Sequence, residues 1–155
     1  MRQFITHSPE ETMDFAERMV QQLKKGMVFT LSGDLGAGKT QFAKGLARGL
    51  GVRETVNSPT FTIVKEYRSG RMPLFHMDVY RISEEEDIGI EDYFDQDGLV
   101  VIEWAENIES WLPESYVQIR IIRQGEQDRK LVLDAVGAAA EQLCEEIDYN
   151  ESAGH

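Results

Sequence analysis

The chain has 155 residues, which suits one domain and is too short for two. Hydrophobic residues make up 41% of it and charged residues 28%, so a packed core is expected and a disordered chain is not. The formal net charge of −12 disfavours direct binding of nucleic acid, because such binding depends on Lys and Arg neutralising phosphates.

Membrane and disulfide classes are also disfavoured. The sequence has no run of about 18 uncharged apolar residues, and residues 1–5 lack the apolar run of a signal peptide. The one cysteine, Cys144, excludes an intrachain disulfide and a cysteine-ligated metal cluster. These features predict a cytoplasmic protein without membrane association.

A short strand at 2–5 and a helix beginning at Ser8 open the predicted fold. Ser8 can cap the helix, and Pro9 suits its first position because the missing N–H would have no partner there. Apolar residues recur at helical spacing after it. The lysines at 24–25 are expected in the last turn, with Gly26 ending the helix.

A strand at 27–31, a glycine-rich segment and a helix at 39–50 are predicted next. Gly49 and Gly51 are expected to end that helix. The remaining predicted elements are strands at 61–67, 73–79 and 99–102, short helices within 83–98 and before 111, an antiparallel strand pair at 116–122 and 130–136, and a final helix at 138–147.

The glycine-rich segment carries the clearest chemistry. It reads Gly33-Asp34-Leu35-Gly36-Ala37-Gly38-Lys39-Thr40 and fits the phosphate-loop pattern G-x-x-x-x-G-K-[ST] at every position. Glycines let successive N–H groups turn toward phosphate oxygens, and the following helix presents its positive end to the same anion. Lys39 can hold the β- and γ-phosphates, and the Thr40 hydroxyl can bind Mg²⁺. The sequence has no N-K-x-D guanine motif, so ATP is favoured over GTP.

Two carboxylates follow apolar runs and are candidates for the reaction. Asp78 and Glu103 each stand at the end of a predicted strand, where a phosphate-loop protein places a second Mg²⁺ ligand or a residue that orients water. The sequence leaves open which of them does which. Thr60 lies on the connection after the phosphate-loop helix, where nucleotide-sensing segments occur. A core role is the commoner one for residues like His76 and Trp104.

The element pattern predicts an α/β fold. It is a P-loop NTPase-like three-layer sandwich, whose mixed central sheet has a parallel core, antiparallel additions and helices on both faces. One domain is expected over residues 1–147, followed by a frayed tail over 148–155.

Five blocks of the sequence together resemble the TsaE family, formerly YjeE, the P-loop ATPases of bacterial tRNA threonylcarbamoyladenosine biosynthesis. The blocks follow one another in the family's order and at roughly its spacing, and the resemblance covers nearly all of residues 1–136. They are the phosphate loop at 33–40, Ser58-Pro59-Thr60-Phe61, His76-Met77-Asp78-Val79-Tyr80-Arg81, Gly89-Ile90-Glu91-Asp92-Tyr93-Phe94 and Ile102-Glu103-Trp104.

The resemblance implies a site and partners. It implies that Thr40 and Glu103 ligate Mg²⁺, with Asp78 and Thr60 close by, and that Lys39 holds the phosphates of ATP. Further nucleotide contacts are implied for Gln41, Trp104 and Glu106, and on the base side for Pro9, Glu10 and Arg129. The implied partners are TsaD and TsaB, whose complex would be reset by ATP hydrolysis, and tRNA would be met only indirectly through them.

Two other functions fit a phosphate loop. A small-molecule kinase would use the same cradle, but residues 104–113 contain no Arg or Lys to serve as a lid clamp. A nucleotide-binding module without catalysis would not need Lys39, Thr40, Asp78 and Glu103 together.

Overall fold

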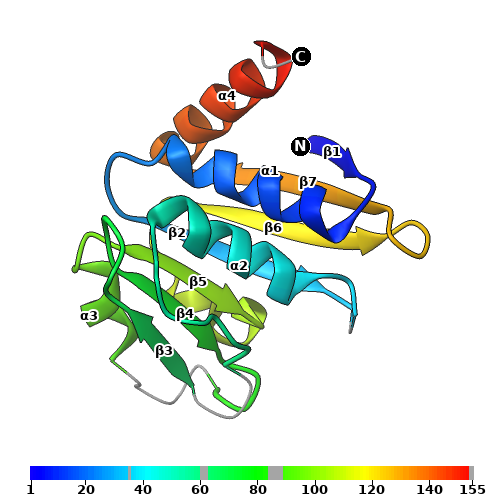
Figure 1. The fold of residues 1–155 in the computed structure, drawn as a ribbon. Coiled ribbons are helices and arrows are strands. Elements are labelled where there is room, and N and C mark those ends of the chain that lie inside the picture. The colour runs from blue at the N-terminus through cyan, green and yellow to red at the C-terminus, as the bar shows by residue number, and fades with distance from the viewer. Residues whose placement is uncertain (35, 60–62, 84–88, 154–155) are drawn as a thin grey trace.

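The structure, a computed structural model, describes residues 1–34, 36–59, 63–83 and 89–153. Among these residues, seven strands form one mixed sheet with helices on both faces, which confirms the predicted fold class (Figure 1). The strands are β1 (Arg2–Thr6), β2 (Met27–Gly33), β3 (Val64–Tyr67), β4 (Leu74–Asp78), β5 (Leu99–Glu103), β6 (Tyr116–Arg123) and β7 (Arg129–Val136). The helices are α1 (Pro9–Gln21), α2 (Lys39–Leu50), α3 (Ile90–Phe94), the 3₁₀ helix η1 (Ala105–Trp111) and α4 (Ala138–Ala153).

The order of the strands brings the functional segments to one edge. The order is β1-β7-β6-β2-β5-β4-β3, in which β6, β2, β5 and β4 are mutually parallel and β1, β7 and β3 run antiparallel to their neighbours. β5 is buried at every position, as expected for a central parallel strand covered on both faces. In the register, Leu31 lies opposite Glu103, and Glu103 lies opposite Asp78. The ends of three neighbouring parallel strands therefore coincide.

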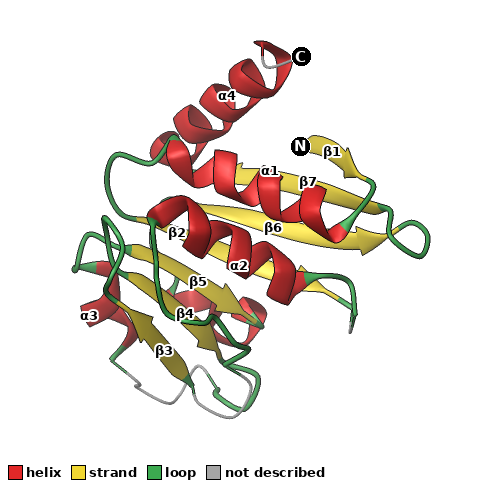
Figure 2. Cartoon of the chain, in the orientation of Figure 1, coloured by secondary structure: helices red, strands yellow, loops and turns green. Residues whose placement is uncertain are grey.

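Side-chain alternation along the strands separates two apolar layers. In β2, Phe29 and Leu31 pack under α1, α2 and α4, whereas Val28 points to the other face. That other face is covered by α3 and η1 through residues such as Ile90 and Ile108. Figure 2 shows α1 and α2 lying side by side across one face of the sheet. The result is the expected three-layer arrangement.

Helix α1 begins as predicted but ends earlier. The Ser8 hydroxyl accepts a hydrogen bond from the Glu11 N–H at 3.1 Å. The helix stops at Gln21, so the lysines at 24–25 lie beyond its last turn. Gly26 serves a close approach instead of a helix end, since a Cβ there would come within 2.9 Å of the Gly98 carbonyl oxygen.

Helix α2 ends at one of the two expected glycines. Gly51 adopts φ +78°, and its N–H reaches back to the Arg48 carbonyl at 3.1 Å. Gly49 lies inside the helix, so the expectation that it ends the helix was wrong. A Cβ on Gly49 would lie 2.2 Å from a methyl group of Val20, which shows that this glycine lets α1 approach α2.

The last helix is longer than the predicted helix at 138–147. Helix α4 continues to Ala153. Its last turns are held by ion pairs, because Arg2 pairs with Asp148 and Arg18 Nε donates to Glu151 Oε1 at 2.7 Å. The partners come from β1 and α1, which lie beside α4, and a sequence pattern along α4 alone cannot reveal them.

Other differences are small. The predicted strand at 61–67 is observed from Val64, and the strand pair at 116–136 is confirmed as β6 and β7. Within the acidic segment at 83–98, one short helix, α3, is observed, and residues 84–88 lie outside the described residues. None of the described helices combines the length and the apolar composition that a membrane crossing requires.

Candidate functional site

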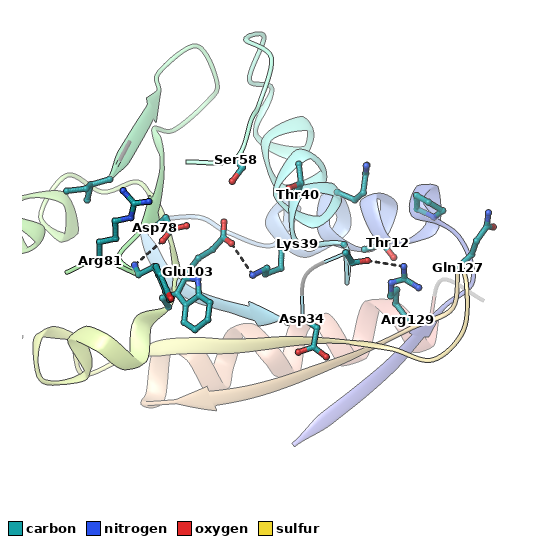
Figure 3. A pocket seen from close by; sticks show the side chains of 18 residues that line it. Thr12, Asp34, Lys39, Thr40, Ser58, Asp78, Arg81, Glu103, Gln127 and Arg129 are labelled. Atoms are coloured by element: carbon teal, nitrogen blue, oxygen red, sulfur yellow. Dashed lines mark hydrogen bonds and ion pairs between the residues drawn. The ribbon is translucent and has the colours of Figure 1, made fainter. Parts of the chain in front are cut away.

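A cavity of about 950 Å³ lies at the edge where β2, β4 and β5 end (Figure 3). Figure 3 shows Gln127 and Arg129 at one end, Asp78 and Arg81 at the other, and Lys39 and Glu103 between them. Its lining residues are Pro9, Thr12, Gly33, Asp34, Gly36, Gly38, Lys39, Thr40, Gln41, Ser58, Ile63, Asp78, Tyr80, Arg81, Glu103, Trp104, Gln127 and Arg129.

The glycines of the loop at 33–40 have distinct roles. Gly36 and Gly38 adopt φ values of +79° and +109°, a backbone region that residues other than glycine rarely adopt. Gly33 is needed for space, because a Cβ there would lie 2.8 Å from the Ile121 carbonyl oxygen. The loop closes on itself through the Ala37 N–H, which donates to the Asp34 carbonyl at 2.9 Å. The loop backbone therefore bends directly before the N-terminus of α2.

Lys39 and Glu103 face each other across the centre of the cavity. Lys39 Nζ lies 3.5 Å from Glu103 Oε1 and 5.8 Å from the centroid of the Trp104 ring. Glu103 is only 7% exposed. Its second oxygen, Oε2, accepts a 2.7 Å hydrogen bond from Nε2 of the buried His76.

These neighbours decide the charge of Glu103. Burial by itself would raise the pKa of the Glu103 carboxyl. The hydrogen bond from His76 and the electrostatic interactions with His76 and Lys39 outweigh burial, so the pKa of Glu103 lies below its ordinary value. The site thus holds a buried, ionised carboxylate beside a lysine.

Asp78 lies next to Glu103 but in a wetter environment. Its Oδ1 accepts a hydrogen bond from the Tyr80 N–H at 2.9 Å, and the side chain is half-buried. The Asn107 side-chain amide donates to the Val79 and Tyr80 carbonyls at 3.2 and 3.0 Å, which ties the end of β4 to η1. A side-chain contact beyond both strands therefore links the segments that follow Asp78 and Glu103.

Trp104 takes a strained backbone conformation at the cavity wall. Its φ of +65° is left-handed, which is uncommon for a bulky residue. Its ring packs against Tyr80 with centroids 4.7 Å apart, and both rings remain substantially exposed. The strained turn directs the indole beside Lys39.

Arg129 holds the phosphate loop from the opposite end. Its Nε donates to the Ala37 carbonyl at 2.7 Å and its Nη2 to the Gly36 carbonyl at 3.3 Å. Its Nη1 lies within hydrogen-bond distance of the carbonyls of Gly125, Glu126 and Asp128. The guanidinium thereby joins the β6–β7 turn to the loop.

Replacing Arg129 tests this connection. Because the sequence predicts that this loop binds ATP, we expect Arg129→Ala to weaken that binding about tenfold, since several hydrogen bonds from a charged donor are lost. Arg129→Lys should lose nearly as much, because an ammonium cannot reproduce the planar fork. Isothermal titration calorimetry measures both, with Arg123→Ala as the matched control. Arg123 Nε donates to the same turn, at the Gly125 carbonyl. Full affinity in Arg129→Lys would contradict the prediction and indicate that charge alone matters.

The structure brings most of the predicted site residues together. Those lining the cavity are Pro9, Gly33, Asp34, Gly36, Gly38, Lys39, Thr40, Gln41, Asp78, Glu103, Trp104 and Arg129. Ala37 is buried in the loop, and Glu10 is exposed on α1 outside the lining. Glu106 lines a neighbouring cavity of about 320 Å³ that also includes Lys39 and Trp104. Leu35 and Thr60 lie outside the described residues.

Six lining residues were not among the predicted site residues, and two of them, Tyr80 and Arg81, follow closely after the predicted Asp78. Thr12 lies one turn after Pro9 on α1, and Gln127 lies in the turn before Arg129, so each adjoins a predicted residue. Ser58 and Ile63 come from the connection that holds Thr60. In the sequence, these residues are distinguished only by lying near a motif. That proximity does not show which of the neighbouring side chains points into the cavity.

Comparison with known proteins identifies the family of this chain. A sequence model of the family described as threonylcarbamoyl adenosine biosynthesis protein TsaE matches residues 6–131. The chain is 50% identical to the tRNA threonylcarbamoyladenosine biosynthesis protein TsaE of Bacillus subtilis over 148 residues, which cover 95% of this chain and 94% of that protein. It is 42% identical to the protein of the same name from Treponema pallidum over 129 residues, which cover 80% and 95%.

A solved structure extends the likeness to the fold. The crystal structure of YdiB from Bacillus subtilis superimposes with a TM-score of 0.85 at 44% identity, covering 97% of this chain and 95% of that one. The part of the chain that the family model matches contains the phosphate loop and both strand-end carboxylates. The chain belongs to the TsaE family.

Proposed function

We propose that the protein binds and hydrolyses Mg²⁺–ATP and thereby serves the formation of threonylcarbamoyladenosine in tRNA, acting on a complex of TsaD and TsaB. The observation that carries the proposal is the pairing of Lys39 with the buried carboxylate of Glu103, 3.5 Å apart, at the mouth of a phosphate loop. A lysine and an ionised carboxylate meeting where a γ-phosphate would lie is an arrangement suited to phosphoryl chemistry.

The loop residues fit a nucleotide's phosphates. The left-handed glycines at 36 and 38 shape the loop backbone, and an added Cβ at Gly36 would meet open space within 4 Å, so the approach to the loop is clear. Lys39 would contact the β- and γ-phosphates, and the N-terminus of α2 would face the same anion. The cavity volume of about 950 Å³ is ample for ATP.

The donor set fits Mg²⁺ in a particular way. Among the described residues, no three His, Cys, Asp or Glu side chains group closely enough to hold a metal by themselves. Mg²⁺ in phosphoryl-transfer sites is held by one or two protein oxygens together with phosphates and water. Thr40 and Glu103, with Asp78 nearby, would supply those oxygens, and the ion would neutralise charge on the phosphates. Such a site needs the nucleotide to be complete.

Hydrolysis then falls to the two carboxylates. Either Glu103 or Asp78 would accept a proton from the attacking water, and the other would position water or metal. The deep burial of Glu103 and its two fixed oxygens favour it for contact with the reaction centre, whereas the half-buried Asp78 has room for an intervening water.

Action on partners is the finer part of the proposal. The relatives are named for threonylcarbamoyladenosine biosynthesis in tRNA. With a net charge of −12, this chain is poorly suited to hold tRNA itself, so a protein complex would carry the tRNA. Ser58 and Ile63 line the cavity from the connection after α2, where nucleotide state is commonly read. We expect slow turnover alone and faster turnover with TsaD and TsaB.

The test is ATP turnover by the purified protein, alone and with TsaD and TsaB of the same organism. A rise of about tenfold or more with both partners supports the proposal. Lys39→Ala, assayed in parallel, should abolish turnover in both conditions. Turnover that ignores the partners would refute the action on that complex. Transfer of phosphate to a metabolite instead of water would favour the kinase alternative.

A further inference from the structure

His76 is a costly residue for packing alone. It lies in β4 with 1% of its surface exposed, and its Nδ1 has no hydrogen-bond partner among the described residues. The residue opposite it in β5 is the apolar Val101. An unpaired polar atom in such a place destabilises the fold, and an apolar side chain would avoid the penalty.

Within the part of the chain that the structure describes, the one hydrogen bond that the His76 side chain makes is with Glu103 of the site. Alternation along the strands puts His76, Asp78 and Glu103 on the same face of the sheet, the one covered by α2. His76 Nε2 lies 2.7 Å from Glu103 Oε2. An ionised carboxylate can only accept, so Nε2 carries the donated hydrogen.

Because of this bond, the two oxygens of Glu103 have different partners. Oε2 is fixed by His76 from within the core, and Oε1 is the oxygen that lies near Lys39 Nζ. Without the imidazole, the carboxylate could rotate about its last bond, and neither oxygen would be specified. Charged groups that react are commonly held in this manner by a buried neighbour.

We propose that His76 is a positioning residue that fixes the Glu103 carboxylate so that Oε1 faces the phosphates and the metal. The proposal rests on the proposed ATPase function. His76 does not touch the nucleotide itself, so its effect passes entirely through Glu103.

Three substitutions at position 76 separate positioning from packing. Glutamine places its amide nitrogen about where Nε2 lies, whereas asparagine places it about where Nδ1 lies. Leucine fills the space without a donor. If His76 positions Glu103, His76→Leu and His76→Asn lose about 10- to 100-fold in kcat with little change in KM, and His76→Gln keeps most of the wild-type rate.

Two further readouts exclude a merely structural role. Melting temperature without nucleotide should not follow the order of the rates, since His76→Leu removes an unpaired buried atom and so should not be the least stable variant. In the Glu103→Gln background, His76→Leu should cause no further loss in kcat, because its target is already gone. An additive loss, rates within twofold of wild type in His76→Leu, or equal loss in the glutamine and asparagine variants would overturn the proposal.

Binding measurements distinguish this proposal from the function on which it rests. If the wild type binds Mg²⁺–ATP but does not hydrolyse it, the proposed function fails. His76 is then judged by the increase in ATP affinity that Mg²⁺ produces, measured by calorimetry. A smaller increase in the leucine and asparagine variants than in wild type and His76→Gln supports positioning of Glu103. An equal increase in all four proteins overturns it.

Discussion

Replacing Glu103 with glutamine is expected to reduce ATP hydrolysis by at least about 100-fold while changing ATP affinity by less than about tenfold. The asymmetry follows from where the contacts are. In the proposed site, the loop at 33–40 and Lys39 would supply the contacts for the phosphates, whereas Glu103 would face the γ-phosphate through a single oxygen, the Oε1 that lies near Lys39 Nζ. Glutamine keeps the size of the side chain and removes its charge. The loss should therefore appear in kcat.

The measurement combines single-turnover hydrolysis with calorimetric titration of ATP in the presence of Mg²⁺. Asp78→Asn is the matched control, because Asp78 lies opposite Glu103 in the register and changes from acid to amide in the same way. A larger loss of kcat in Glu103→Gln than in Asp78→Asn assigns the water-activating role to Glu103. If affinity collapses together with the rate, Glu103 is chiefly a metal anchor, and the expected separation of kcat from affinity is wrong.

The sequence was sufficient for the parts of the site that depend on local rules. A phosphate loop is a contiguous sequence pattern that follows a strand and precedes a helix. Residues 33–40 could therefore be placed at the N-terminus of α2. Asp78 and Glu103 could be placed because each follows an apolar run that reads as a buried strand. Their meeting at one edge then follows from parallel strands, whose carboxyl ends coincide.

Contacts between distant segments could not be predicted in the same way. The bond from His76 to Glu103 requires β4 beside β5 in one particular register, since a slip by one residue would turn His76 to the opposite face. Arg129 reaches Gly36 and Ala37 only because β6 and β7 continue the sheet on the far side of β2. Neither order nor register is encoded in the period of a single strand.

The role of a glycine also depends on contacts with distant segments, which the sequence does not show. Gly49 was expected to end a helix, because a glycine near a helix terminus commonly does so. The structure places it with Gly45 on the face of α2 that meets α1, where absence of a side chain is what matters. Glycine's preference for turns is a local property that the sequence reveals. A close approach of two helices depends on the partner helix, which the sequence around the glycine does not reveal.

Gly45→Ala is expected to destabilise the fold by about 2 kcal/mol, although alanine is the better helix former by about 1 kcal/mol. An added Cβ would lie 2.3 Å from the Met13 carbonyl oxygen and 2.8 Å from the Ala16 Cβ. The first of these is backbone and cannot turn aside, so α1 and α2 must separate and lose packing along their length. Overpacking and helix propensity have opposite effects here. The sign of the change in the free energy of unfolding therefore shows which effect is larger.

Urea unfolding measures the change, and Gly125→Ala provides the control. A Cβ on Gly125 meets nothing closer than 3.8 Å, so that variant should stay within about 0.5 kcal/mol of wild type. For a chain of this size, the loss at Gly45 corresponds to a fall in melting temperature of roughly 4–8 °C. A Gly45→Ala protein as stable as wild type would mean that the helices yield at little cost. The close contact of α1 with α2 would then contribute little to holding the phosphate-loop helix against the sheet.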